Sequence, residues 1–329
     1  MRHKSERPFR GAEAAQKRGP PSLLGTIVVS GAAHVPVLPG EVMAYLAPQS
    51  GGRYIDATIG GGGHSRAILD AAAPDGRVLG LDRDLDMVTG VCAQLGEAIS
   101  AERLQVVHAS FASLARVAAA EGFNAVDGVL FDLGLSSYHL DASGRGFSFA
   151  RTEPLDMRFD ASDADREHAA DLLASRDADE LTRLFRTYGE ERFASRIART
   201  IVARRRTAPL QTTADLLAAI EQSLPPAVRW RAGRDAARIF QALRIATNAE
   251  LEAVTAALPQ AAGMLRSGGR LVVISFHSLE DRIVKNFFRD EQQAGRLRIL
   301  TRKPVQPGDA ELAANPRAAS AKLRAAERT

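Results

Sequence analysis

The chain has 329 residues, of which 45% are hydrophobic and 25% charged. This length can bury a full core and predicts two domains or one enlarged domain, and the composition is ordinary for a soluble globular protein. A single cysteine, Cys92, excludes a disulfide framework and a cysteine-based zinc site, and no apolar run approaches the roughly 18 residues of a membrane span. We therefore expect a cytoplasmic protein without a membrane partner and without a structural metal.

The net charge of +4 is concentrated at the N-terminus. Residues 1–33 hold six Lys/Arg against two Glu, so the rest of the chain is balanced. This segment also contains Pro20-Pro21 and few large apolar residues, which predicts a disordered basic leader. An organellar transit peptide is the alternative, and we favour a leader without a targeting role.

Strands and helices are predicted to alternate from His34 onward. An extended entry and a helix are followed by strands at 53–57, 77–81, 104–109 and 126–133, with helices at 64–73, 85–95 and 114–120 between them. A helix at 251–265 and an apolar strand at 270–276 resume the pattern. This alternation predicts an α/β fold with a Rossmann-like parallel sheet covered on both faces.

About a hundred residues interrupt the alternation. Residues 150–191 hold twelve Asp/Glu and six Arg, whereas residues 192–244 hold eleven Arg and three acids. Apolar residues in both stretches recur at helical spacing, and TTADLLAAIEQSL opens on a Thr suited to cap a helix. We predict a helical substrate-recognition domain at 141–240, inserted into an α/β domain formed by 34–140 and 241–329.

The motif DATIGGGGHS, at 56–65, predicts a nucleoside-cofactor site. Its four glycines lie between a strand and a helix, where the backbone can approach a ligand closely. Asp82 ends the next strand about 20 residues further on, where a βαβ unit places the carboxylate that binds ribose hydroxyls. A glycine turn without a ligand is disfavoured because four glycines lose much backbone entropy on folding.

Three classes of cofactor can be compared with this loop. A mononucleotide P-loop requires Lys-Ser/Thr after its glycines, and here His64-Ser65 follow. A dinucleotide fold requires G-x-G-x-x-G, and counting from Gly60 the last position is Ser65, so the match is incomplete. S-adenosylmethionine needs a glycine turn, a carboxylate for its ribose and an apolar slot for adenine. Asp56 and Asp82 suit this cofactor better than the other two.

Two further residues are expected on the same rim of the sheet, because ligands of open α/β sheets bind beyond the carboxyl ends of the strands. Asp132 begins DLGLSS and is predicted to accept hydrogen bonds from the amine of the methyl donor or of the substrate. Its alternative role is to cap the following turn. Phe111 is placed to stack on adenine, although a core phenylalanine would have the same sequence context.

The motif SFHSLEDR, at 275–282, follows the strand at 270–276. His277 and Ser278 are predicted to line the substrate pocket, with His277 as a proton acceptor near neutral pH. An equally supported alternative is a helix start, in which Ser278 is the N-cap and Asp281 completes a capping box.

Arginines in the second half of the insertion predict an RNA-binding surface. They form the run Arg204, Arg205 and Arg206 and the group Arg229, Trp230, Arg231 and Arg234. Guanidinium groups beside an aromatic suit phosphate contacts and base stacking. The alternative is a solvated helix face that pairs with the acidic half of the insertion, and we expect some of both.

Nine motifs, in this order, resemble the bacterial 16S rRNA (cytosine-N4)-methyltransferases of the RsmH (MraW) family. They are HVPVLPGEV, DATIGGGGHS, LDRD, FDLGLSS, RGFSF, PLDMR, FQALRIATNAEL, SFHSLEDR and NPRAASAKLR. The resemblance spans about residues 34–328 and implies a class I S-adenosylmethionine-dependent methyltransferase domain with an inserted helical domain. It also implies N4-methylation of a cytosine in the decoding centre of 16S rRNA. The implied partner is this RNA within the small ribosomal subunit.

The resemblance also implies roles for individual residues. Those assigned to the cofactor are Gly62, Gly63 and His64 for its methionine part, Asp82 for ribose, Phe111 for adenine, and Asp132 near the methyl donor. The family usually has SSPQLD where this chain has SSYHLD, so His139 stands at the position of a glutamine cofactor contact. The second loop glycine, Gly61, replaces a frequent arginine.

Transfer to an exocyclic amine requires that amine in line with the electrophilic methyl group. Asp132, supported by the carbonyls of Gly134 and Leu135, is predicted to hold the amine of an unstacked cytosine. The alternatives are a non-catalytic RNA-binding protein of ribosome assembly and an amino-methyltransferase with another acceptor. DNA amino-methyltransferases typically carry an Asn/Asp/Ser-Pro-Pro-aromatic tetrapeptide where this chain has DLGL. An NAD-dependent dehydrogenase is a more distant alternative.

Overall fold

The computed structural model describes residues 27–29 and 32–329. Most of the leader predicted at 1–33 lies outside these residues. Two short strands that fall largely within the predicted leader, β1 (Ile27–Val29) and β2 (Ala32–His34), pair antiparallel. Regular structure therefore begins before the start that the sequence predicted near His34.

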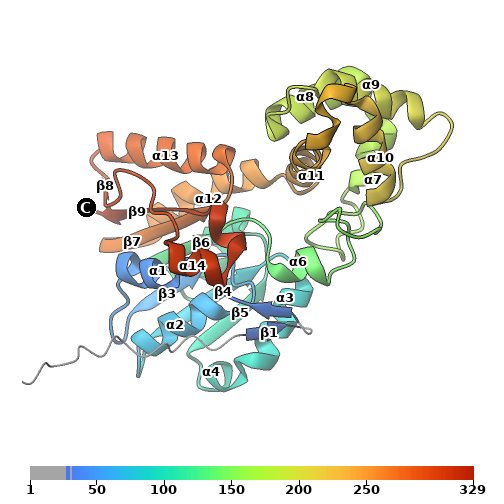
Figure 1. The fold of residues 1–329 in the computed structure, drawn as a ribbon. Helices are drawn as coiled ribbons and strands as arrows, with labels where there is room; N and C mark the ends of the chain where they lie inside the picture. The colour runs from blue at the N-terminus through green and yellow to red at the C-terminus, as the bar shows by residue number, and fades with distance from the viewer. Residues whose placement is uncertain (1–26, 30–31) are drawn as a thin grey trace, which may run out of the picture.

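A seven-stranded sheet forms the centre of the larger lobe (Figure 1). Across the sheet the strands are β5 (Leu104–His108), β4 (Arg77–Asp82), β3 (Arg53–Asp56), β6 (Val126–Asp132), β7 (Leu265–Ser275), β9 (Lys322–Arg328) and β8 (Leu297–Ile299). The first five run parallel, and β9 is antiparallel to both of its neighbours. The predicted α/β fold with a Rossmann-like parallel sheet is confirmed, whereas β8 and β9 were not predicted.

Helices cover both faces of the sheet because the strands are apolar on both faces. Along β7, Leu271 and Val273 belong to one core and Val272 and Ile274 to the other, as the two-residue period of a strand requires. The first core includes residues from α5 (Leu114–Ala120), α12 (Glu250–Met264) and α13 (Ser278–Gln293). The second includes residues from α1 (Pro39–Leu46), α2 (Gly63–Ala71) and α3 (Leu85–Gln94), with α4 (Gly96–Ser100) packed against it.

A separate lobe of helices stands off the sheet at the upper right of Figure 1. It contains α7 (Ala169–Ser175), α8 (Ala178–Gly189), α9 (Ala194–Arg204), α10 (Thr213–Ser223), the 3-10 helix η2 (Pro226–Arg231) and α11 (Ala232–Asn248). These helices enclose a third hydrophobic core, which extends from Phe147 to Leu243 and so reaches just beyond the boundary predicted at 240.

The helices of this lobe begin and end at residues with clear local causes. The predicted Thr cap of α10 is present, because the Thr212 hydroxyl accepts the backbone N–H of Asp215. The helical spacing of apolar residues across 177–206 belongs to two helices. The break lies at Glu190, whose left-handed backbone (φ 48°) ends α8 and turns the chain into α9. Among the described residues, no helix combines the length and apolar character needed to cross a membrane.

Candidate active site

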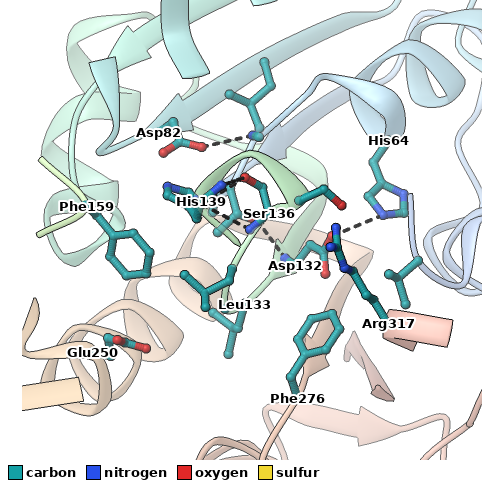
Figure 2. Close-up of a pocket in the computed structure, with 18 of the residues that line it drawn as sticks. His64, Asp82, Asp132, Leu133, Ser136, His139, Phe159, Glu250, Phe276 and Arg317 are labelled. Carbon is teal, nitrogen blue, oxygen red and sulfur yellow. Dashed lines mark hydrogen bonds and ion pairs between the residues drawn. The ribbon is translucent and has the colours of Figure 1, made fainter. Parts of the chain in front are cut away.

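A cavity of about 320 Å³ lies at the carboxyl edge of the parallel strands. The strand ends of β3, β4 and β6 place Asp56, Asp82 and Asp132 along this edge. Figure 2 shows Asp82, His64 and Asp132 around one hollow, together with Arg317 from the C-terminal segment. Of the predicted cofactor residues, the cavity is lined by Gly63, His64, Asp82, Phe111, Asp132 and His139.

Asp82 organises the glycine loop. One of its carboxylate oxygens accepts the backbone N–H of Gly60 at 3.0 Å, and the other accepts that of Asp84 at 2.9 Å. Each oxygen retains a lone pair, and the side chain lines the cavity, so both are available to hydroxyl donors of a ligand. Burial raises the pKa of Asp82, although these two backbone N–H groups oppose the rise.

The glycines differ in what they do. Gly60 and Gly63 line the cavity. Gly62 does not; it precedes α2 with a left-handed backbone (φ 78°), and a Cβ there would lie 3.1 Å from Leu95 Cδ1. The glycine run is therefore required by turn geometry and packing as well as by close approach to a ligand.

His64 and Asp132 form a buried pair inside the cavity. His64 Nε2 lies 3.6 Å from Asp132 Oδ2, which is an ion pair rather than a hydrogen bond. Burial alone would lower the pKa of His64, but the carboxylates of Asp132 and Asp56 outweigh it and raise that pKa. Among the described residues, His64 Nε2 and Asp132 Oδ1 are buried without a hydrogen-bond partner. Unpaired buried polar atoms are costly, so these two point to a bound ligand.

Asp56 lies behind this pair. It is 1% exposed, and one of its oxygens accepts the Ser65 hydroxyl at 2.8 Å. Burial raises its pKa to about 6, while the nearby His64 opposes the rise. Asp56 therefore contributes to the electrostatics of the site without lining the cavity.

An apolar part of the cavity is formed by Phe111, Leu133 and Val254. The Phe111 ring packs edge-on against Phe131, with ring centroids 5.6 Å apart, which orients its ring. Stacking of Phe111 on adenine stays a prediction.

A second aromatic faces the loop that follows β6. Gly134 has a φ of 96°, and a Cβ built on it would lie 3.3 Å from the Phe276 ring. Both residues line the cavity, so the ring and the bare backbone of Gly134 bound one part of it.

His139 is held by a buried network. Its Nε2 lies 2.9 Å from Asp84 Oδ2, and its Nδ1 accepts the backbone N–H of Ser136 at 3.1 Å. Arg145 also binds Asp84 and donates to the carbonyl oxygen of Phe159 at 2.6 Å. Because both ring nitrogens of His139 are engaged, it presents only ring carbons to a ligand, unlike the glutamine expected from the family.

The helix-start interpretation of SFHSLEDR is supported, shifted by one residue. His277, not Ser278, is the N-cap of α13, and Glu280, not Asp281, completes the capping box. Neither His277 nor Ser278 is among the residues that line the cavity, whereas Glu280 is. The Ser278 hydroxyl donates to Glu190 of the helical lobe at 2.7 Å. Ser278 therefore joins the two lobes in this structure.

The arginines predicted to bind RNA have different surroundings. Arg205 donates to the carbonyl oxygens of Leu173 and Arg176, each at 2.6 Å, and so supports the fold of the helical lobe. Arg231 pairs with the buried Asp235 at 3.3 Å. The remaining members are accessible to solvent: Arg204, Arg206, Arg229, Arg234 and Trp230, the last 82% exposed.

Several cavity residues were not predicted. Phe276 and Arg317 lie within motifs that the sequence had already marked, SFHSLEDR and NPRAASAKLR. Arg244 and Glu250, from the motif FQALRIATNAEL, also line the cavity and are joined by two hydrogen bonds of 2.8 Å each. Arg244 belongs to α11 of the helical lobe, whereas Glu250 begins α12, which packs on the sheet. The way the two lobes are joined therefore brings this pair to the cavity.

One group of side chains has the composition of a metal site. Ligand atoms of Glu250, His277 and Glu280 lie within 4.8 Å of one another. Arg244 already neutralises Glu250, and His277 Nε2 lies 3.1 Å from Glu280 Oε1. Protein side chains therefore already lie within ion-pair distance of both carboxylates of this group.

Comparison with known proteins identifies the family of this chain. The model of the MraW methylase family matches residues 31–329. Relatives named ribosomal RNA small subunit methyltransferase H include one from Thermomicrobium roseum, 52% identical over 90% of this chain and 93% of its own length. Others are from Geobacter sulfurreducens, 46% identical over 90% of this chain and 98% of its own, and Nitrobacter hamburgensis, 48% identical over 90% and 91%. This chain belongs to the MraW methylase family.

Proposed function

We propose that this chain methylates the exocyclic N4 of a cytidine in the decoding centre of 16S rRNA, with S-adenosylmethionine as methyl donor. The observation that carries the proposal is the buried, unpartnered Asp132 Oδ1 in a cavity bounded by the glycine loop and Asp82. The names of the relatives, which specify small-subunit ribosomal RNA, support the substrate class. We place the reaction in the cytoplasm, on RNA within the small ribosomal subunit.

The residues present fit S-adenosylmethionine. His64 Nε2, which has no hydrogen-bond partner, and the backbone of Gly63 suit the polar amino-acid end of the cofactor. Asp82 offers two carboxylate oxygens to the ribose hydroxyls, and Phe111 offers an aromatic face to adenine. When bound, the cofactor supplies an electrophilic methyl group on a sulfonium.

Asp132 would act on the acceptor amine. The lone pair of a cytosine amine is delocalised into the ring, which makes the nitrogen a poor nucleophile. A hydrogen bond from that N–H to the ionised carboxylate favours the localised lone pair, and the low polarity of the site strengthens the bond. The backbone carbonyls of Gly134 and Leu135 are the second candidate acceptors.

The cavity would also orient the base and exclude water. The Phe276 ring and the bare Gly134 backbone bound the part of the cavity next to Asp132, which suits a flat heterocycle. A base within a duplex cannot reach this depth, so the target cytidine must be unstacked or flipped. Holding the amine at near-attack distance is the main catalytic contribution of these residues.

The proposal is tested by methyl transfer from radiolabelled S-adenosylmethionine to small subunits from a strain lacking this protein. Nucleoside mass spectrometry then identifies the labelled nucleoside. Label in N4-methylcytidine is the expected result. Label in another nucleoside would refute the assignment of the acceptor. Cofactor binding without label on subunits or naked rRNA would favour a non-catalytic role in ribosome assembly instead.

A further inference from the structure

We propose that a groove along α9 binds the phosphate backbone of the RNA at a point distant from the methylated nucleotide. The inference rests on the proposed function, because it takes RNA as the acceptor. The groove is lined by residues of α9, of the turn after it, and of α10: Arg196, Arg199, Thr200, Ala203, Arg204, Thr207, Ala208 and Gln222. Only Arg204 belongs to the surface that the sequence predicted.

The groove follows from the amphipathic sequence of α9, ASRIARTIVAR. One face of the helix is buried in the core of the helical lobe, where Ile197 and Ile201 are fully covered. Arg196 and Arg199 fall on the opposite side, and both are exposed. Packing of one face of the helix therefore fixes a row of guanidinium groups on the other.

These positive charges are not compensated locally. In the described part of the chain, no ion pair involves Arg196, Arg199 or Arg204, whereas nearby Arg176 pairs with Glu167 at 2.7 Å. Asp215 is close enough to Arg204 for the charge of that arginine to help lower the pKa of Asp215, after the larger effect of the Thr212 hydroxyl. One carboxylate beside three arginines leaves the groove with an excess of positive charge.

The chemistry of the lining favours a phosphate backbone over an acidic protein. Protein–protein interfaces are built around large apolar or aromatic side chains, and the only apolar residues in this lining are two alanines. Arginine, threonine and glutamine are the side chains that donate to phosphate oxygens. Contacts of this kind give affinity and register without reading base sequence.

The position of the groove defines the substrate further. The helical lobe, on which α9 lies, stands apart from the sheet whose edge forms the cavity (Figure 1). An RNA that occupies both must be large enough to span the two lobes. The groove therefore selects a folded, extended RNA surface over a short oligonucleotide that carries only the target base.

The test is an Arg196→Gln/Arg199→Gln double variant, with Arg116→Gln/Arg302→Gln as the charge-matched control. Arg116 and Arg302 are exposed on the sheet-containing lobe, and no ion pair of the described residues involves them. Methyl transfer to small subunits gives kcat and KM, filter binding of purified 16S rRNA at several salt concentrations gives the salt slope, and circular dichroism checks folding.

Loss of two phosphate contacts should raise KM about tenfold with kcat unchanged, and should reduce the salt slope of RNA binding by about 2. The control should match wild type in both. Wild-type KM and salt slope in the double variant would show that α9 presents only a solvated helix face. If wild type transfers no methyl group, the proposed function fails, but the salt slope of rRNA binding still decides whether the groove binds RNA.

Discussion

Replacing Asp82 by Asn should separate its two roles, in the glycine loop and in cofactor binding. The carboxylate accepts backbone N–H groups from Gly60 and Asp84, one on each oxygen. An asparagine has one oxygen, so its amide N–H must face one of these backbone donors. The unpaired donor should lower the free energy of unfolding by about 1–3 kcal/mol.

Cofactor affinity should fall as well, because a neutral amide replaces a charged acceptor for the ribose hydroxyls. A hydrogen bond to a charged group contributes about 1.5–3 kcal/mol, which corresponds to a roughly 10- to 150-fold increase in Kd. Calorimetric titration with S-adenosylhomocysteine measures the affinity, and urea unfolding measures the stability. Asp70→Asn, on the exposed side of α2, is the matched control and should change neither. Binding within threefold of wild type in Asp82→Asn would refute the role of Asp82 in cofactor recognition.

Two further predictions concern buried charges. The pKa of Asp56 rises from 3.8 to about 6, so the folded state holds this proton more tightly than the unfolded state. Raising the pH from below 3.8 to above 6 should therefore lower the free energy of unfolding of wild type by about 3 kcal/mol more than that of Asp56→Asn. Equal pH dependence of unfolding in the two proteins would show that Asp56 is not the source of this loss. Arg145→Met leaves the buried Asp84 with His139 as its remaining side-chain partner and should lower stability by about 3–5 kcal/mol in urea unfolding. A loss below 1 kcal/mol would show that His139 alone compensates Asp84.

The parallel sheet and the carboxylates at its carboxyl edge were predictable because the sequence patterns that indicate them are local. Alternating apolar runs gave the five parallel strands, and the rule that ligands bind beyond strand carboxyl ends placed Asp82 and Asp132 on one edge. The antiparallel β9 could not be found in this way. Its sequence, KLRAAER, lacks a continuous apolar run, and it takes its place between β7 and β8 only through long-range pairing.

The remainder of the site depends on contacts between distant segments. Arg244 and Glu250 reach the cavity because α11 leads from the helical lobe back to the sheet, and no sequence pattern specifies that geometry. His139 shows the converse. Its position in the motif indicated a ligand contact, but Asp84, 55 residues earlier in the chain, engages its ring. Likewise, Arg205 serves the fold although its two neighbours in the arginine run are accessible to solvent.

Single-turnover methyl transfer by Asp132→Asn, with cofactor binding measured on the same sample, tests the proposed active site most directly. The side chain keeps its size but loses the charge that would localise the lone pair of the amine. We predict transfer to small subunits slower by at least about 100-fold, with an unchanged circular dichroism spectrum and S-adenosylhomocysteine affinity within about tenfold of wild type. Transfer at the wild-type rate would contradict the assignment of Asp132 as the residue that acts on the acceptor amine.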